Sequence, residues 1–131
     1  MQPLPPHVSS QEFNFPIEPT AKGRPRFAGG HAFTPAKTRM AEEGLKEGLL
    51  AEGAECYPRD TALKVDLVFG VPRPKRKVIL PTTRPDLDQY VKLVLDAGNE
   101  VLWADDAQIV SITAIKVYAE LPFTKIRVEE A

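Results

Sequence analysis

Four aspartates in the second half of the chain have types and spacings suited to binding a metal ion. Asp86 and Asp88 lie two residues apart at the start of a predicted helix, and Asp105 and Asp106 precede a predicted strand. On a regular helix the first two side chains would diverge by about 200°. They can converge only if Asp86 still belongs to the extended segment that the preceding proline favours. Lys92 lies one helical turn after Asp88 and can reach the same side.

Three carboxylates with open coordination positions suit Mg²⁺ or Mn²⁺, which are hard ions that prefer oxygen ligands. Such an ion polarises a phosphate oxygen and lowers the pKa of a bound water, which then attacks in line. Ordinary structural interpretations also exist. Asp86 could be a helix N-cap, Asp88 and Lys92 an exposed ion pair, and Asp105–Asp106 two turn acids before a strand. The residues alone leave both interpretations open.

The charges are segregated along the chain although the formal net charge is only −1. Two stretches contain basic residues and no acids: Lys22, Arg24, Arg26, Lys37 and Arg39, then Arg73, Lys75, Arg76, Lys77 and Arg84. Both contain glycine or proline, which predicts loops rather than charged helices. Solvated faces explain most charge runs. Two basic loops beside an acidic pocket would nevertheless suit phosphodiester cleavage, because the loops attract the backbone phosphates and the acids hold the cation.

The length and composition predict one domain that positions these groups. The chain has 131 residues, of which 43% are apolar, and its 13 prolines argue against an all-helical bundle. A single cysteine excludes an intramolecular disulfide and a multi-cysteine zinc site. No apolar run approaches the roughly 20 residues of a bilayer span, so no membrane association is expected. We expect a mobile proline-rich tail over residues 1–11 and a single domain over 12–131.

Periodicity predicts an α+β (α/β-like) fold with two main helices packed on a mixed sheet. One predicted helix starts with Thr34 as N-cap and Pro35 at its first position, and a second, amphipathic helix ends at Gly98. The Gly29–Gly30 pair predicts a turn in a loop or hairpin. The predicted strands are an edge strand over 12–17, a half-buried strand over 63–69, a central strand over 109–119 and a short strand at 126–128.

The segments 84–89 (RPDLDQ) and 103–109 (WADDAQI), with Lys92 and Asp96 between them, resemble the RusA-type Holliday-junction resolvases. The segments 22–27 (KGRPRF) and 34–38 (TPAKT) are similar to the N-terminal pattern of that family. The resemblance covers nearly the whole chain, from about Phe13 to Val128. The combination of PDxD, Lys and DD in this order is specific, whereas the KGRPR element alone is a weak signal.

The resemblance implies a RusA-like fold and a structure-specific endodeoxyribonuclease that resolves Holliday junctions by paired, symmetric, Mg²⁺- or Mn²⁺-dependent cuts. Asp86, Asp88 and Asp106 match the family's metal-binding aspartates. Lys92 matches a lysine implicated in catalysis, where a cation stabilises charge developing on the phosphate. The resemblance leaves open whether Asp105 also contacts the metal. Gln89 departs from the family's usual asparagine, which puts the cleavage rate in doubt.

The resemblance also implies a homodimer that binds four-way or other branched DNA in the bacterial cytoplasm, often encoded by a phage or prophage. The candidate phosphate contacts are Lys22, Arg24, Arg26, Lys37, Arg73, Lys75, Arg76 and Lys77. Two alternatives are a related nuclease for another branched DNA or RNA and a junction-binding protein that cuts weakly or not at all. Apolar spacing predicts that Tyr90 and Trp103 pack in the core rather than stack on DNA bases.

Overall fold

Four strands form a mixed sheet in which the strand order is β1–β6–β4–β5. The computed structural model describes residues 10–23, 26–33, 35–75 and 78–131, and for 26–28 and 31–33 it describes the backbone alone. β6 pairs antiparallel with both of its neighbours, while β4 and β5 are parallel. The strands span β1 Ser10–Phe15, β4 Leu63–Pro72, β5 Ile109–Ala119 and β6 Phe123–Glu130. The predicted mixed sheet is confirmed, and β6 is longer than predicted.

The prediction that 109–119 forms a central strand is wrong, although its limits are correct. β5 lies at the edge of the sheet, and β4 and β6 are the inner strands. The prediction rested on apolar residues at both parities. Several of these are exposed, including Val110 at 65%, Ile112 at 43% and Ile115 at 44%. Apolar residues on both faces of a strand therefore did not mean burial on both faces.

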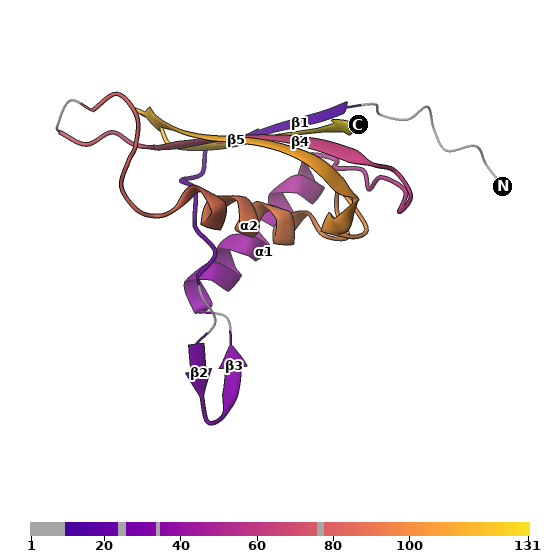
Figure 1. The fold of residues 1–131 in the computed structure, drawn as a ribbon, viewed down its shortest axis with the longest axis horizontal. Helices are drawn as coiled ribbons and strands as arrows, with labels where there is room; N and C mark the ends of the chain where they lie inside the picture. Colours follow the sequence, from indigo (N-terminus) through magenta and orange to yellow (C-terminus); the bar gives the residue numbers. More distant parts are fainter. Residues whose placement is uncertain (1–9, 24–25, 34, 76–77) are drawn as a thin grey trace.

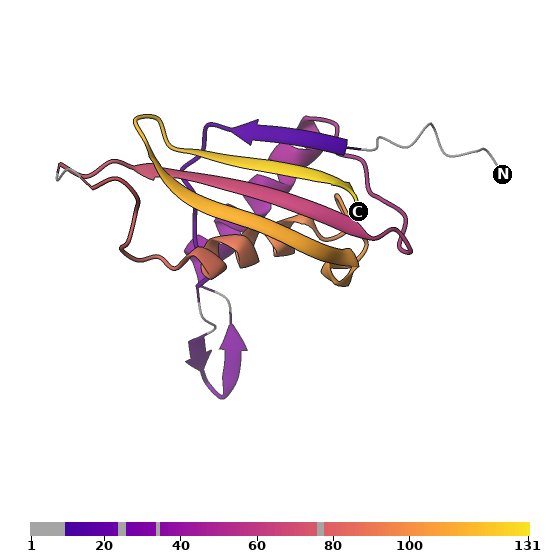
Figure 2. The same ribbon diagram turned by 45° about the horizontal axis from the view of Figure 1, so that its top comes forward.

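Both long helices, α1 (Ala36–Ala51) and α2 (Leu87–Gly98), cover the same face of the sheet and pack against each other (Figure 1). Within the described part of the chain, no helix or loop covers the opposite face, which we call the bare face (Figure 2). The core lies between the sheet and the helices, where β4 alternates buried and half-buried residues from Leu63 to Phe69 as its period of two requires. The fully buried core side chains include Leu49, Val65, Phe69, Val94, Trp103 and Val128. None of the helices in the described ranges has the length and hydrophobicity that a bilayer crossing requires.

The two aromatic residues that could have stacked on DNA bases belong to the core, as predicted. Tyr90 is 5% exposed and stacks on Phe69 with ring centroids 5.2 Å apart. Trp103 is completely buried, and its Nε1 donates to the Leu95 carbonyl (3.3 Å) and to Asn99 Oδ1 (3.1 Å). A buried indole needs a partner for its N–H, and the end of α2 supplies two.

The helix limits follow the local sequence closely. α2 ends at Gly98 as predicted. α1 starts at Ala36 with Pro35 in the N-cap position, one residue later than predicted. The predicted N-cap, Thr34, is outside the described residues. Pro35 has extended backbone angles (φ −53°, ψ 143°), which places it just before the helix rather than in its first turn.

A two-stranded hairpin projects away from the sheet and the helices (Figure 1). It consists of β2 (Arg26–Ala28) and β3 (His31–Phe33), joined by Gly29 and Gly30, which have φ angles of 58° and 79°. Glycine tolerates these positive angles without steric cost, so the glycine pair correctly predicted a turn. Nearer the N-terminus, β1 begins at Ser10, so the last two residues of the predicted tail (1–11) belong to this strand. Residues 1–9 are outside the described residues.

Candidate functional site

The start of α2 presents two aspartates to solvent. Asp86 is the N-cap residue, with extended backbone angles (φ −69°, ψ 145°) and no capping hydrogen bond from its side chain. Its carboxylate is therefore not used as a helix cap. Lys116 attaches the segment before the helix to β5, because its Nζ donates to the carbonyl oxygens of Thr83 and Pro85, each at 3.1 Å. Asp88, in the first turn, is also exposed.

The two adjacent aspartates after α2 have different environments. Asp105 caps the 3₁₀ turn η1 (Asp106–Gln108), and its carboxylate accepts a hydrogen bond from the Ala107 N–H at 3.0 Å. The pKa of Asp105 lies below its ordinary value. The main cause is the hydrogen bond from Ala107, and hydrogen bonding with the Asp106 side chain adds to it. Asp106 Oδ2 lies instead 3.8 Å from Lys92 Nζ. Asp105 thus acts as a turn acid, while Asp106 faces α2.

Gln108 fixes the turn that carries both acids. Its Oε1 accepts from the backbone N–H groups of Ala104 (2.8 Å) and Asp105 (3.2 Å). Its Nε2 donates to the carbonyl oxygens of Pro58 (2.8 Å) and Thr61 (3.1 Å). The side chain is buried, so these four bonds satisfy polar groups that water does not reach. The turn is therefore attached to the loop before β4.

Lys92 pairs with acids beyond it in the sequence. Its Nζ lies 3.1 Å from Asp96 Oδ1, one turn further along α2, and 3.8 Å from Asp106. Among the described residues, an ion pair between Lys92 and Asp88 is absent within 4 Å. The exposed Asp88–Lys92 pair considered from the sequence is therefore not formed. Instead, Lys92 connects α2 to the η1 turn.

Lys22 pairs with acids on both helices. Its Nζ lies 3.0 Å from Asp96 Oδ2 and 3.3 Å from Glu42 Oε2, and its backbone N–H donates to the Gln89 carbonyl at 2.8 Å. Burial alone would lower the pKa of Lys22, but the hydrogen bond and charge of Asp96, with those of Glu42, outweigh burial and raise it. These pairs favour an anchoring role over the predicted phosphate contact, which stays a prediction.

Glycine lets the chain after Lys22 approach α1 closely. The Gly23 N–H donates to the buried hydroxyl of Thr38 at 3.0 Å, and a Cβ on Gly23 would lie 2.9 Å from that hydroxyl oxygen. The two segments that resembled the family's N-terminal pattern thus contact each other. They join the base of the hairpin to α1.

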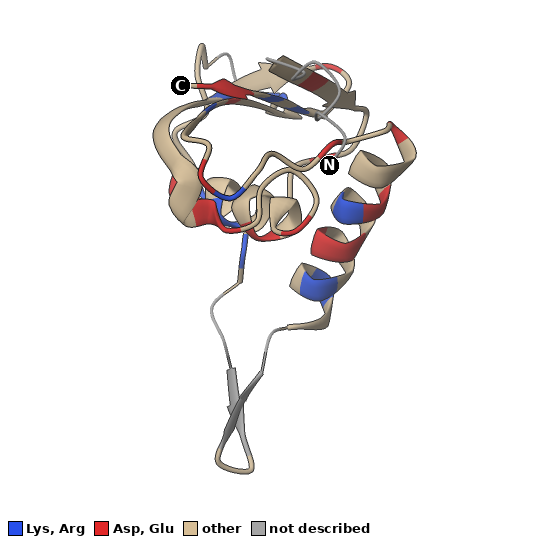
Figure 3. Ribbon diagram, turned by 90° about the vertical axis from the view of Figure 1, so that its right-hand side faces the viewer, with Lys and Arg blue, Asp and Glu red and all other residues tan. Residues whose placement is uncertain are grey.

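Three other predicted phosphate contacts, Lys37, Arg73 and Lys75, have exposed side chains. Figure 3 shows both signs of charge along α1, on which Lys37 lies in the first turn. The side chain of Arg26 is not described, and the remaining predicted contacts lie outside the described residues: Arg24, Arg76 and Lys77.

Two hollows flank Pro85, next to Asp86, and share Glu18, Pro85 and Tyr90 in their walls. One, of about 500 Å³, includes Lys37, and the other, of about 210 Å³, includes Arg84 and Lys116. Basic residues therefore line both sides of the segment that leads to the exposed aspartates. This is a suitable place for a polyanion to approach the acids.

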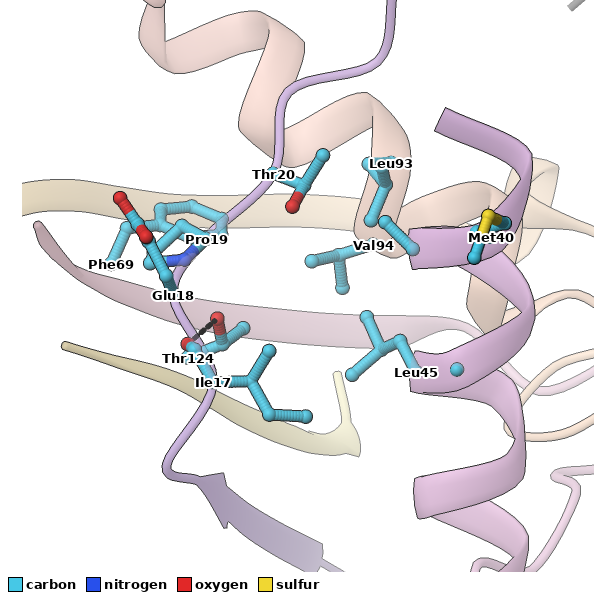
Figure 4. Close-up of a pocket in the computed structure, with 12 residues that line it drawn as sticks. Ile17, Glu18, Pro19, Thr20, Met40, Leu45, Phe69, Leu93, Val94 and Thr124 are labelled. Carbon is cyan, nitrogen blue, oxygen red and sulfur yellow. Dashed lines mark hydrogen bonds between the residues drawn. The ribbon is translucent and has the colours of Figure 1, made fainter. Parts of the chain in front are cut away.

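A third pocket, of about 250 Å³, lies between α1, α2 and residues 17–20 (Figure 4). Its walls are mainly apolar, with Leu45, Phe69 and Val94 facing the space and Glu18 as the one acid. It contains none of the predicted catalytic residues. An anionic phosphodiester would lose its hydration there without gaining a cation, so this pocket is not the candidate site.

The donor chemistry fits a hard divalent ion, but the side chains are not gathered into a complete ligand set. Within the described ranges, no three His, Cys, Asp or Glu side chains are grouped closely enough to hold a metal ion. Asp86 and Asp88 lie at the start of α2, and Asp106 lies beside Lys92 on the η1 turn. The assignment of these three aspartates as joint ligands therefore stays a prediction.

Sequence reasoning gave no role to Asp96, Gln108 and Lys116, although each holds part of the site in place. Asp96 and Gln108 lie within or between the segments that resembled the RusA family, so their positions carried a signal. Lys116 carried none, because its contacts depend on how β5 lies against the segment before α2.

Two comparisons with known proteins identify the family of this chain. Residues 16–129 match the protein family described as Endodeoxyribonuclease RusA. The chain is also 31% identical, over 133 aligned positions, to the uncharacterized protein YqaN of Bacillus subtilis (strain 168), and the alignment covers 86% of this chain and 91% of that protein. The family match includes both helices, the acidic segments and all of β4 and β5. This chain belongs to the RusA endodeoxyribonuclease family.

Proposed function

We propose that this protein is a homodimeric endodeoxyribonuclease that resolves four-way DNA junctions by paired, symmetric, divalent-metal-dependent cuts. The main support is the family match over residues 16–129, which makes the chain a member of a nuclease family that acts on branched DNA. The geometry adds two exposed aspartates that cap nothing and a lysine that faces a third aspartate.

In this proposal Asp86, Asp88 and Asp106 hold Mg²⁺ or Mn²⁺, and Lys92 acts on the reacting phosphate. A bound divalent ion would supply Lewis-acid stabilisation and a water of lowered pKa. The Lys92 ammonium would offset the negative charge that grows on the phosphate oxygens, which is worth most where water is excluded. Lys37, Arg73 and Lys75 would bind neighbouring phosphates and orient the DNA strand without recognising its sequence.

The test compares a labelled four-way junction with a linear duplex of the same sequence, each with Mg²⁺, with Mn²⁺ and with a chelator. Asp88→Asn should lower junction cleavage by about 10²-fold or more, since a metal ligand is lost. It should keep or improve binding, since a charge that repels the phosphates is lost. Glu120→Gln removes an equal charge from the exposed turn between β5 and β6 and serves as the control. Wild-type cleavage by Asp88→Asn would remove that residue from the proposed site.

We place the dimer contact on the bare face of the sheet. Val68, Ile115, Val117 and Phe123 share that face by strand register, and Ile115 is 44% exposed. The other three side chains are half-buried, so Ile115 is the exposed centre of an apolar patch, and such patches commonly mark an interface. Ile115→Lys should shift the sedimenting mass from dimer to monomer. A cruciform plasmid should then yield nicked circles in place of linear DNA, because two cuts in one junction need two sites. An unchanged dimer would move the contact elsewhere.

A junction-binding protein with weak cleavage is the second candidate, and two observations favour it. The three aspartates do not form a complete ligand set among the described residues, and Gln89 occupies the usual asparagine position. This candidate predicts tight junction binding with no cutting in Mg²⁺ or Mn²⁺. If Gln89→Asn restored cleavage, the glutamine would be the cause.

A further inference from the structure

Asp96 is the most sheltered acid of the ion-pair cluster that contains Lys92. Its side chain is 16% exposed, compared with 31% for Asp106 and 54% for Lys92. Each of its two oxygens contacts a different ammonium group, Oδ1 that of Lys92 and Oδ2 that of Lys22. A carboxylate held from both sides has one orientation, and its charge is screened less by salt than an exposed one.

Lys92 does not pair with the acid that an isolated helix would favour. An acid four residues before a lysine pairs better than an acid four residues after it, so Asp88 should be preferred to Asp96. The structure has the reverse arrangement, with Lys92 on Asp96 and extending to Asp106. Something outside the helix must therefore favour Asp96.

Lys22, which lies outside α2, is the residue that favours the pairing with Asp96. Its backbone is fixed to α2 by the hydrogen bond to the Gln89 carbonyl, and its ammonium is shared between Glu42 on α1 and Asp96. The Asp96 carboxylate is thereby held in the position where its second oxygen receives Lys92. Lys22 also directly precedes Gly23, through which this segment is attached to α1.

We infer that Asp96 is a positioning residue that holds the Lys92 ammonium beside Asp106, and that Lys22 orients Asp96 for this task. The inference rests on the proposed nuclease function for its catalytic consequence. In this proposal Asp96 contacts neither the reacting phosphate nor the attacking water and acts only through Lys92. Without its carboxylate, Lys92 would turn toward Asp88 or into solvent, away from the Asp106 side of the site.

The cleavage test separates the rate of the chemical step from binding. Asp96→Asn keeps the shape of the side chain and removes its charge. It should lower the single-turnover cleavage rate of a four-way junction about 10²-fold, since a small misplacement near reacting atoms has effects of this size. The junction Kd should stay within twofold. Asp96→Glu should recover part of the rate, and Glu47→Gln, an exposed acid on α1, serves as the matched control.

Combination with Lys92→Met distinguishes positioning from a general structural role. If Asp96 works through Lys92, then Asp96→Asn should cause no further loss of rate in the Lys92→Met background. Losses that multiply, or a loss confined to binding, would overturn the inference.

A second readout needs no cleavage and no metal. In protein labelled with ¹³C at lysine Cε, Asp96→Asn should shift the Cε–Hε signals of both Lys22 and Lys92, which Lys22→Met and Lys92→Met identify by removing them. Glu47→Gln should leave both signals in place. An unshifted Lys92 signal in Asp96→Asn overturns the inference even if the rate falls. If the wild-type protein cuts no junction, the proposed function fails, and the lysine signals still decide whether Asp96 holds Lys92.

Discussion

Replacing Gly98 with alanine tests whether the end of α2 and Trp103 fit together as described. A Cβ at position 98 would lie 2.8 Å from both Cε2 and Cη2 of the indole and closer still to Cζ2. Real Cβ contacts are essentially never shorter than 3.0 Å, so the ring would have to move. The ring is fully buried and is held by hydrogen bonds to Leu95 and Asn99. It therefore cannot move without disturbing its neighbours.

The expected cost follows from this geometry. Overpacking a tight core by one methyl group destabilises by about 1–3 kcal/mol. For a chain of this length that is a fall in Tm of about 4–12 °C. Gly44→Ala is the matched control, because a Cβ there meets nothing within 4 Å and the position is exposed in the interior of α1. That variant should gain about 0.5–1 kcal/mol from the better helix propensity of alanine.

Urea and thermal unfolding followed by circular dichroism would measure both variants. The cleavage assay adds a functional readout, because Trp103 lies three residues before Asp106, and a displaced ring should move Asp106 away from Lys92. Gly98→Ala should thus lose cleavage at temperatures where it is still folded. A Gly98→Ala protein as stable as Gly44→Ala would refute the packing of Trp103 described above.

Three further predictions concern other parts of the site. Gln108→Ala leaves buried backbone groups of Ala104, Pro58 and Thr61 without their hydrogen-bond partner. It should lower the free energy of unfolding in urea by about 1–3 kcal/mol. Wild-type stability would contradict the role of Gln108 in attaching the turn to the loop before β4. Because the ion pairs raise the pKa of Lys22 above its ordinary value of 10.5, its contribution to stability is complete below that pH and is lost as the pH rises through the folded-state pKa. The difference in unfolding free energy between wild type and Lys22→Met should therefore be constant from about pH 7 to 9 and shrink by about pH 11. A difference that grows at high pH would contradict the pairing. Arg73→Ala with Lys75→Ala should weaken junction binding and reduce the slope of log Kd against log salt by roughly one per lost phosphate contact, whereas an unchanged slope would remove this segment from the DNA interface.

The sequence predicted those parts of the fold that depend on local patterns. The apolar spacing of α2 and its terminal Gly98 defined that helix correctly, and the Gly29–Gly30 pair marked the hairpin turn. The limits of β5 were also correct. Its place at the edge was not predictable from its own residues, because the order of strands depends on which neighbour supplies hydrogen bonds.

The site shows the same division between local and long-range information. Residue types and spacing identified Asp86, Asp88, Lys92 and the Asp105–Asp106 pair as candidates, and the family resemblance selected Asp106. They could not distinguish Asp105, which caps a turn, from Asp106, which faces Lys92, because that choice depends on the rotation of a three-residue turn. Nor could they show that Lys22 pairs with Asp96, which lies 74 positions later on another element.

The parallel pairing of β4 and β5 has a consequence for how this fold can vary. Two parallel neighbours require a long return path from one end of the sheet to the other. Here residues 73–108 form that path, and it carries every proposed acid together with Lys92. Deletion of this segment would remove the covalent link to the edge strand and the proposed acids together. Truncated forms that keep the sheet but lack the chemistry should therefore be rare, and loss of activity without loss of folding should arise by single substitutions.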